Sequence, residues 1–280
     1  MAIFIQPISP VAVDLFGLEI RWYALAYVAA FLFGYWLVRR MVAKWPNNNL
    51  PLGTKKSWDD LLTYVILGTI IGGRLGYVLF YNLPFFITNP LEIFAIWNGG
   101  MAFHGGLAGV IAAVFLFAWK YRDKKKSLAK IGFGILDMMA IVTPIGLFFG
   151  RIANFINMEV MGRETTSALG IVFIDRAGVP IGDAIPRHAS PLYEAAIEGL
   201  LLFIIMFALW RWTRLRERPG ALGGIFGMLY AAFRIFAEQF RAPDAHIGFL
   251  TNWGLTMGQL LSAIMFAIAA VIFVWSMRKK

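Results

Sequence analysis

Long apolar stretches recur along almost the whole chain, and they restrict its fold more than any other feature. A membrane-spanning helix needs roughly 20 mainly apolar residues. Seven stretches meet that length, at about 18–38, 60–81, 101–119, 133–156, 190–210, 221–240 and 253–276. Soluble domains carry about 25% charged residues, whereas this chain carries 15% charged and 59% hydrophobic residues. The sequence therefore predicts an all-α polytopic membrane protein with seven transmembrane helices.

Basic residues gather in alternate loops of this pattern and predict its orientation. The loops after the first, third and fifth spans and the C-terminus hold 18 of the 26 Lys and Arg residues, including all ten lysines. Because cytoplasmic loops are enriched in Lys and Arg, these segments are expected in the cytoplasm, with the N-terminus outside and the C-terminus inside. No Lys or Arg precedes Arg21, so no cleaved leader is expected. The formal net charge of +10 follows this topology, and no nucleic-acid partner is expected.

The basic residues outside those four segments are all arginines. They are Arg21, Arg74, Arg151, Arg163, Arg176, Arg187, Arg234 and Arg241. Arginine stays charged and binds phosphate or carboxylate through two parallel hydrogen bonds. The outer half therefore contains an anion site, or lysine was simply excluded from translocated segments. The chain has no cysteine, which excludes disulfides and thiolate nucleophiles, and the sequence points to no metal and no cofactor.

The stretch GRIANFINMEVMGRE at 150–164 concentrates polar residues at the end of the fourth apolar stretch. If the helix continues into it, Arg151, Asn154 and Asn157 are three residues apart and share one face. Arg151 alone could be an interfacial anchor, but the amides and carboxylates beside it favour a binding site. The loop region 157–189 is expected to form a small domain at the outer face, with a short hairpin around a turn at 175–178.

Two central polar residues each allow two interpretations. Gly68, Gly72 and Gly76 follow one another at four-residue spacing, which predicts a close contact between helices. Arg74 lies among them and either reaches the lipid headgroups or belongs to an anion site. His104 stands in a glycine-rich stretch and is either a core histidine or a proton acceptor.

The sixth span carries a stripe of polar residues. Tyr230, Arg234 and Glu238 are four residues apart and lie on one helical face. Such residues are costly inside an apolar helix unless they face a cavity, although an Arg234–Glu238 pair could also be purely structural. Tyr23 and Tyr27 share a face of the first span and fit an aromatic belt at the outer interface.

Five segments resemble the prolipoprotein diacylglyceryl transferases of bacteria, in order and spacing, over nearly the whole chain. They are FHGGLAG, GRIANFINMEVMGRE, RHASPLYEA, LYAAFRIFAEQFRAPD and LTMGQLLS. The chain departs from the usual glycine of that family at Ala153 and Met158. The resemblance implies one transmembrane catalytic domain over residues 1–280, in the bacterial cytoplasmic (inner) membrane and active toward the outer, periplasmic face.

The resemblance also implies a reaction and its partners. The diacylglyceryl group of phosphatidylglycerol would pass to the lipobox cysteine of a prolipoprotein, forming a thioether and releasing glycerol phosphate, as the first step of lipoprotein maturation. The expected partners are phosphatidylglycerol, the lipobox segment and membrane lipids. A non-catalytic transporter or scaffold for anionic lipids is the rival class, because it would use the same arginines without His104. A membrane-assembly subunit is a third alternative.

Residue roles follow from the same resemblance. The expected catalytic residues are His104, Arg151, Arg234 and Tyr23. The expected substrate-binding residues are Arg151, Asn154, Glu159, Gly162, Tyr230, Glu238, Arg241 and Arg74. Arg151 would hold the lipid phosphate and Arg234 the leaving phosphate. The resemblance does not assign the group that takes the thiol proton, and His104 is the best candidate for it. A proton must leave because the thiolate is the reactive form.

Overall fold

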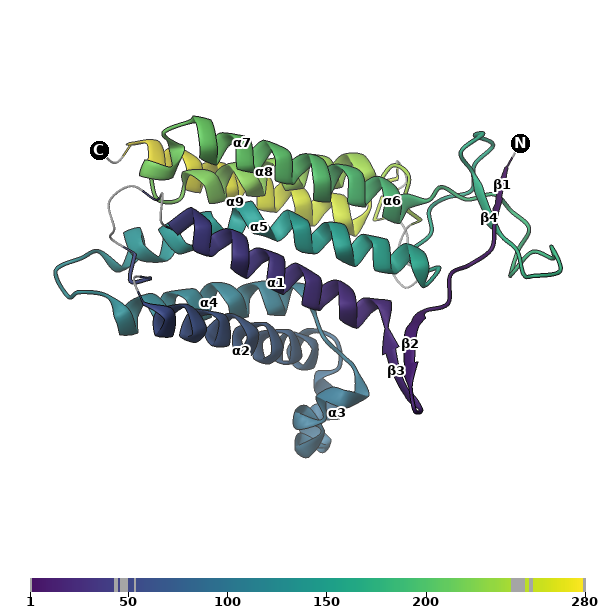
Figure 1. Cartoon of the computed structure of the whole chain (residues 1–280), viewed down its shortest axis with the longest axis horizontal. Coiled ribbons are helices and arrows are strands. Elements are labelled where there is room, and N and C mark those ends of the chain that lie inside the picture. Colours follow the sequence, from purple (N-terminus) through teal and green to yellow (C-terminus); the bar gives the residue numbers. More distant parts are fainter. Residues whose placement is uncertain are drawn as a thin grey trace. The chain divides into compact units, whose positions relative to one another are not determined.

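The residues of the chain form two compact units (Figure 1). The computed structural model describes residues 2–42, 45, 50–52, 54–242, 250–251 and 254–278, apart from the side chains of residues 98, 103 and 104. The larger unit comprises Met1–Lys44 and Met138–Lys280, and the smaller unit comprises Trp45–Asp137. Helix α5 (Leu128–Ile156) contributes residues to both units.

The larger unit is a bundle of long helices. Besides the second part of α5, it contains α1 (Trp22–Val42), α6 (Ser190–Glu194), the π-helix η3 (Ala195–Leu201), α7 (Leu202–Trp212), the short 3-10 helix η4 (Leu215–Glu217), α8 (Ala221–Ala237) and α9 (Met257–Arg278). Small residues bring α8 and α9 together, because a Cβ atom on Gly227 would lie 2.7 Å from Cβ of Ala269. This packing fixes α8, which carries the predicted polar stripe.

The smaller unit is organised around one close helix pair. Its elements are α2 (Lys55–Phe80), α3 (Leu83–Thr88), the 3-10 helices η1 (Pro90–Phe94) and η2 (Ile96–Asn98), α4 (Phe103–Tyr121) and the start of α5. A Cβ atom on Gly76 would lie 2.7 Å from Cα of Gly105, and one on Gly72 would lie 2.7 Å from Cα of Gly109. The close contact predicted from the glycine spacing is therefore confirmed.

Four short strands accompany the helices in the described part of the larger unit. Strand β1 (Ile3–Ile5) pairs in parallel with β4 (Ile171–Phe173), and β2 (Val11–Leu15) pairs antiparallel with β3 (Leu18–Arg21). The predicted turn at 175–178 is confirmed by an antiparallel bridge between Ile174 and Pro180. Neither strand pair was predicted, but the strands are three to five residues long and the fold is otherwise helical.

The predicted start of the first span was wrong for a local reason. The sequence placed it near residue 18, but residues 18–21 form β3 and the helix begins at Trp22. A two-residue turn connects β2 to β3, with Phe16 at φ 55° and Gly17 at φ 91°. Asp14 Oδ1 accepts a 2.8 Å hydrogen bond from the Gly17 amide and closes this turn. The apolar residues Leu18 and Ile20 extend an apolar pattern that hydropathy alone cannot separate from the helix.

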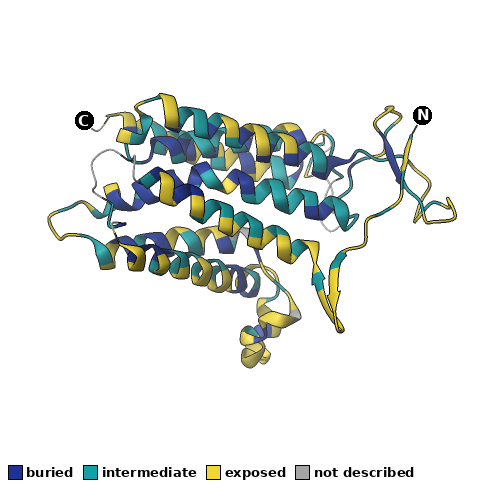
Figure 2. Ribbon diagram, viewed as in Figure 1, coloured by how far each residue is buried: buried dark blue, intermediate teal, exposed yellow. Residues whose placement is uncertain are grey.

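The helices have the length and polarity of a multi-pass membrane protein. Among the described residues, five are long and apolar enough to cross a membrane: Trp22–Val42, Lys55–Phe80, Leu128–Ile156, Ser190–Trp212 and Met257–Arg278. Gly105–Tyr121 and Ala221–Ala237 are shorter apolar helices. Figure 2 shows exposed residues along the helices. Leu32 and Phe80 are among the exposed residues, at 65% and 83%, whereas Glu194 is fully buried. Apolar groups outside and charges inside are the arrangement expected in lipid.

Candidate functional site

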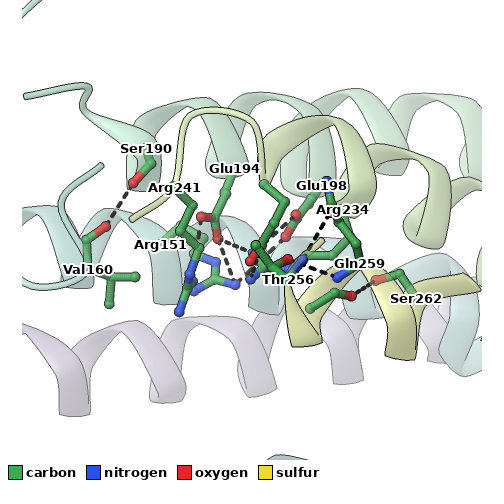
Figure 3. Close-up of polar contacts among 12 residues, drawn as sticks. Arg151, Val160, Ser190, Glu194, Glu198, Arg234, Arg241, Thr256, Gln259 and Ser262 are labelled. Carbon is green, nitrogen blue, oxygen red and sulfur yellow. Dashed lines mark hydrogen bonds and ion pairs between the residues drawn. The ribbon is translucent and has the colours of Figure 1, made fainter. Parts of the chain in front are cut away.

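Three arginines and three glutamates of the larger unit form one buried ionic cluster. The arginines are Arg151 on α5, Arg234 on α8 and Arg241 beyond the end of α8, and the glutamates are Glu194, Glu198 and Glu238. Figure 3 shows five of these side chains, from Arg151, Glu194, Glu198, Arg234 and Arg241, converging between the helices. The cluster has a formal charge balance of zero, although each member lies in or next to an apolar helix.

Glu194 is the hub of this ionic cluster. Its Oε2 atom lies 2.7 Å from Nη2 of Arg151 and 3.0 Å from Nη1 of Arg234. Its Oε1 atom lies 3.6 Å from Nη1 of Arg241. One carboxylate therefore joins three arginines that come from three different parts of the chain. Removing one partner of a buried ion pair is costly because the other charge is left uncompensated.

Glu198 and Glu238 complete the set of carboxylates. Glu198 Oε2 lies 3.8 Å from Arg151 and its Oε1 lies 3.7 Å from Arg234, and neither buried oxygen has a hydrogen-bond donor among the described residues. Glu238 Oε2 lies 2.9 Å from Nη2 of Arg234. The Arg234–Glu238 pair expected from the four-residue spacing is thus confirmed.

The π-helix places the two central glutamates. Glu194 ends α6 and Glu198 lies within η3, so both project from one continuous helical stretch. Gly199 lets this stretch approach α5, because a Cβ atom there would lie 2.7 Å from Cα of Phe148. Single π-helical turns occur frequently at functional sites. Here the turn lies where the glutamates face Arg151.

The arginines are the accessible part of the cluster. The side chains of Glu194 and Glu198 are 0% exposed, whereas those of Arg151, Arg234 and Arg241 are 20%, 12% and 18% exposed. The glutamates therefore hold the guanidinium groups from the buried side. The accessible guanidinium edges can offer paired N–H donors to an anion such as a phosphate.

A second polar group adjoins the ionic cluster and is called here the Glu159 group. It comprises Tyr23, Asn154, Asn157 and Glu159. Glu159 Oε2 accepts hydrogen bonds from Tyr23 Oη at 3.3 Å and from Asn154 Nδ2 at 3.2 Å, and Asn154 Nδ2 also contacts Tyr23 Oη closely. Arg151 Nη1 donates to Asn154 Oδ1 at 3.4 Å, so the two groups are directly connected.

Gly162 and Arg163 fix the segment that carries Arg241. Gly162 forms an antiparallel bridge with Arg241, and its amide donates a 2.8 Å hydrogen bond to the His188 carbonyl. A Cβ atom on Gly162 would lie 2.8 Å from Cβ of His188, so only glycine fits without displacement. Arg163 Nε donates to the Arg241 carbonyl at 2.8 Å. Gly162 therefore acts through backbone position.

A separate ion pair lies in the loop region outside the helices. Arg187 Nη2 lies 2.7 Å from Asp183 Oδ2 and 3.5 Å from Glu164 Oε1. The hydrogen bond from Arg187 lowers the pKa of the Asp183 carboxyl. These side chains are 31% to 61% exposed, so water screens the pair and its contribution to stability is small.

The structure brings most of the predicted site residues together. Those in or beside the two polar groups are Tyr23, Arg151, Asn154, Glu159, Gly162, Arg234, Glu238 and Arg241. Tyr230 lies one turn before Arg234 on α8, and its ring stacks on Phe226.

Two predicted site residues belong to the smaller unit. Arg74 is buried and donates hydrogen bonds to the backbone carbonyls of residues 92, 93, 95, 99 and 100, so it holds the segment between α3 and α4. His104 is the second residue of α4, and its side chain lies outside the described part of the chain.

The two central glutamates, Glu194 and Glu198, were not among the predicted site residues. Glu194 lies in the segment RHASPLYEA, which was quoted only for the family resemblance, and Glu198 lies outside every quoted segment. A signal was available, because two carboxylates four residues apart inside an apolar span are expensive and usually functional. Arg234 and Glu238 were selected because they are charged residues inside an apolar span, and Glu194 and Glu198 meet the same criterion.

Comparisons with known proteins agree with the segments quoted above. Residues 10–275 match the family model described as prolipoprotein diacylglyceryl transferase. A phosphatidylglycerol–prolipoprotein diacylglyceryl transferase of Rhodospirillum rubrum is 48% identical, covering 98% of this chain and 94% of that protein. Proteins of the same name from Paramagnetospirillum magneticum and Rhodospirillum centenum are 45% and 46% identical over 97% and 95% of this chain, and over 95% and 91% of their own lengths. The chain therefore belongs to the prolipoprotein diacylglyceryl transferase family.

Proposed function

We propose that this protein transfers the diacylglyceryl group of phosphatidylglycerol to the lipobox cysteine of a prolipoprotein. The cysteine sulfur forms a thioether with the diacylglyceryl carbon, the bond from that carbon to the phosphate oxygen breaks, and glycerol phosphate leaves. The observation that supports this proposal best is the cluster of three arginines held from behind by buried glutamates. Its relatives of nearly equal length carry the name of this activity.

The arginines fit the anionic donor and its leaving group. Arg151 and Arg234 share Glu194 Oε2, so their guanidinium groups are held close together. In this proposal Arg151 binds the lipid phosphate and Arg234 stabilises the charge that grows on the departing phosphate. Preorganised donors aimed at developing charge are usually the largest single contribution to catalysis.

The attacking group belongs to the second substrate, so the absence of cysteine from this chain is no obstacle. The thiol must lose its proton, because the thiolate is the nucleophile. His104 is the proposed proton acceptor. Tyr23 and Tyr230 are proposed to orient the lipid or the thiol, while Asn154, Glu159, Gly162, Glu238 and Arg241 line or brace the site. Arg74 is proposed to bind substrate, and it also donates hydrogen bonds to the carbonyls of residues 92, 93 and 99.

The proposed site requires a defined topology. We propose seven spans with the N-terminus outside and the C-terminus in the cytoplasm, one catalytic domain over both units, and a loop domain at 157–189 on the outer face. The protein would lie in the bacterial inner membrane, with its site open to the periplasmic side. Lysine confined to four segments supports this orientation.

One assay tests the function directly. Purified protein is incubated with phosphatidylglycerol and a peptide that contains a lipobox cysteine, and the peptide is analysed by mass spectrometry. We expect a mass gain of one diacylglyceryl group on the cysteine, together with release of glycerol phosphate. A lipid transporter or scaffold would bind phosphatidylglycerol and leave the peptide unchanged, which would refute the proposal.

A further inference from the structure

The Glu159 group contains hydrogen-bond acceptors that no donor among the described residues uses. Glu159 Oε2 accepts from Tyr23 and Asn154, and Glu159 Oε1 accepts from Asn157 Nδ2 at 3.3 Å. A carboxylate has about four acceptor positions, and Glu159 is exposed. A further donor can therefore reach this carboxylate.

Asn157 supplies a second unused acceptor. Its Oδ1 atom is buried and has no hydrogen-bond partner among the described residues. The Nδ2 atom of the same amide donates to Glu159, so the free oxygen belongs to a group already fixed beside the carboxylate. Buried polar atoms are nearly always satisfied, and an exception calls for an explanation such as a missing ligand.

The backbone on either side of Glu159 is strained. Met158 has φ 56° and Val160 has φ 57°, and both lie in the left-handed region that non-glycine residues rarely adopt. The Glu159 amide donates to the Asn154 carbonyl at 2.9 Å, and Ser190 Oγ donates to the Val160 carbonyl at 2.8 Å. Strain of this kind persists only where the surroundings enforce it, and it clusters at functional sites. The strained backbone fixes the direction of the Glu159 side chain.

The Glu159 group adjoins the proposed phosphate site. Arg151 Nη1 donates to Asn154 Oδ1 at 3.4 Å, and Asn154 donates in turn to Glu159. A ligand held by its phosphate at Arg151 would therefore carry its neighbouring atoms past this group. These acceptors match ligand hydroxyl groups that lie three or four bonds from a phosphate ester oxygen.

We propose that Glu159 and Asn157 bind the hydroxyl groups of the glycerol headgroup and thereby set the preference for a polyol headgroup. This inference rests on phosphatidylglycerol being the donor lipid. The arginines read the phosphate, which all phospholipids share. The Glu159 group binds the hydroxyls, which distinguish glycerol from headgroups that have none. Sites built to hydrogen-bond a hydroxyl reject analogues that lack it, because their polar groups are then left unpaired.

The test compares two lipids with the same phosphate and acyl chains. One is phosphatidylglycerol, and the other is phosphatidylpropanol, which lacks the two headgroup hydroxyls. Lipid binding in detergent and transfer to a lipobox peptide are measured for both. We expect wild-type protein to prefer phosphatidylglycerol in both measurements. In Glu159→Gln, which keeps the shape but loses the charge, we expect this preference to fall roughly tenfold or more.

The controls separate this inference from folding and from the proposed function. Glu164→Gln changes an exposed carboxylate that pairs with Arg187, and it should leave the preference unchanged. Asn157→Ala removes the unused acceptor and should lower the preference even if Glu159→Gln is unstable. Equal binding of both lipids by wild type, or equal slowing of both by Glu159→Gln, would overturn the inference. If wild-type protein binds phosphatidylglycerol selectively but does not lipidate the peptide, the proposed transferase function is refuted and the inference about the headgroup stands.

Discussion

Arg151 occupies the position where the ionic cluster and the Glu159 group meet. Its guanidinium contacts Glu194 through Nη2 and Asn154 through Nη1, so two edges of one planar group are engaged. Lysine keeps the charge but has no planar fork to span these two partners. The geometry of this residue, as well as its charge, is therefore expected to matter.

Arg151→Lys should reduce transfer roughly 100-fold while the protein remains folded, because a preorganised donor of this kind contributes about that factor. The measurement is the initial rate of peptide lipidation, with thermal unfolding in detergent as the check on folding. Lys125→Ala removes a positive charge from the loop after the third predicted span, and it should change neither the rate nor the unfolding temperature. Near-normal turnover of Arg151→Lys would identify Arg151 as an interfacial anchor.

His104→Gln should slow the chemical step about 10²–10⁴-fold with lipid binding retained, if His104 takes the thiol proton. An unperturbed thiol has a pKa near 8.5, so alkaline solution supplies thiolate without the histidine. The variant should therefore recover activity between about pH 8 and 9.5 more than wild type does. The pH–rate profiles of both proteins give the comparison. Loss of lipid binding would instead assign His104 to the headgroup, and loss of thermal stability alone would make it a core residue.

For single residues, the sequence predicts which charged side chains belong to the site better than it predicts backbone conformation. Arg234 and Glu238 stand out because charges are rare in apolar helices, and Glu198 carries the same signal. The left-handed conformation of Val160 could not be predicted from its residue type, because β-branched residues disfavour that conformation. Met158 is different, because the resembling family usually has glycine there and the structure gives it φ 56°. The departure from glycine thus marked a position of unusual backbone.

Among the elements, the α2–α4 pair shows most directly how spacing in the sequence becomes contact. Glycines recur every four residues on α2 and meet Gly105 and Gly109 of α4 backbone to backbone. This contact was predictable because it needs only one face of one helix. The β1–β4 ladder was not, because its strands are three residues long and show no period of their own.

Gly72→Ala should destabilise the smaller unit, because the new Cβ would lie 2.7 Å from Cα of Gly109, a backbone atom that cannot move freely. Overpacking of this kind costs about 1–3 kcal/mol, so the thermal midpoint in detergent should fall. Gly106→Ala is the matched control on the facing helix, since its nearest neighbour is the Thr69 carbonyl oxygen at 3.6 Å. If both variants unfold at the same temperature, the close approach of α2 and α4 is wrong.

For the whole molecule, hydropathy identified the position of every long helix, with errors of a few residues at the ends. The helix predicted at 221–240 ends at Ala237, and the one predicted at 101–119 runs from Phe103 to Tyr121. The loop region was harder, because its backbone bridges join Gly162 to Arg241 and Glu164 to Arg187. Such long-range pairs depend on where the helices place the ends of the loops, and no local sequence pattern predicts that.

The orientation can be tested with reporter fusions. A reporter active only outside the cytoplasm should be active when fused after Pro180 and silent when fused after Lys125, because the lysine-rich segments stay inside. The activity of the reporter is measured in intact cells and divided by the amount of each fusion protein. The reverse pattern would move the Glu159 group and the arginines to the cytoplasmic side and would refute the proposed placement.

The pairing of β1 with β4 sets an order of events during synthesis. Ile3, Phe4 and Ile5 leave the ribosome well before their partners Ile171, Val172 and Phe173, because α1 to α5 lie between them in the sequence. The ladder therefore cannot form while α1 to α5 are being synthesised. When β4 has been made, it can pair with β1. Closure of this ladder is thus a late event of chain synthesis, and it joins β1 to a segment made after α1 to α5.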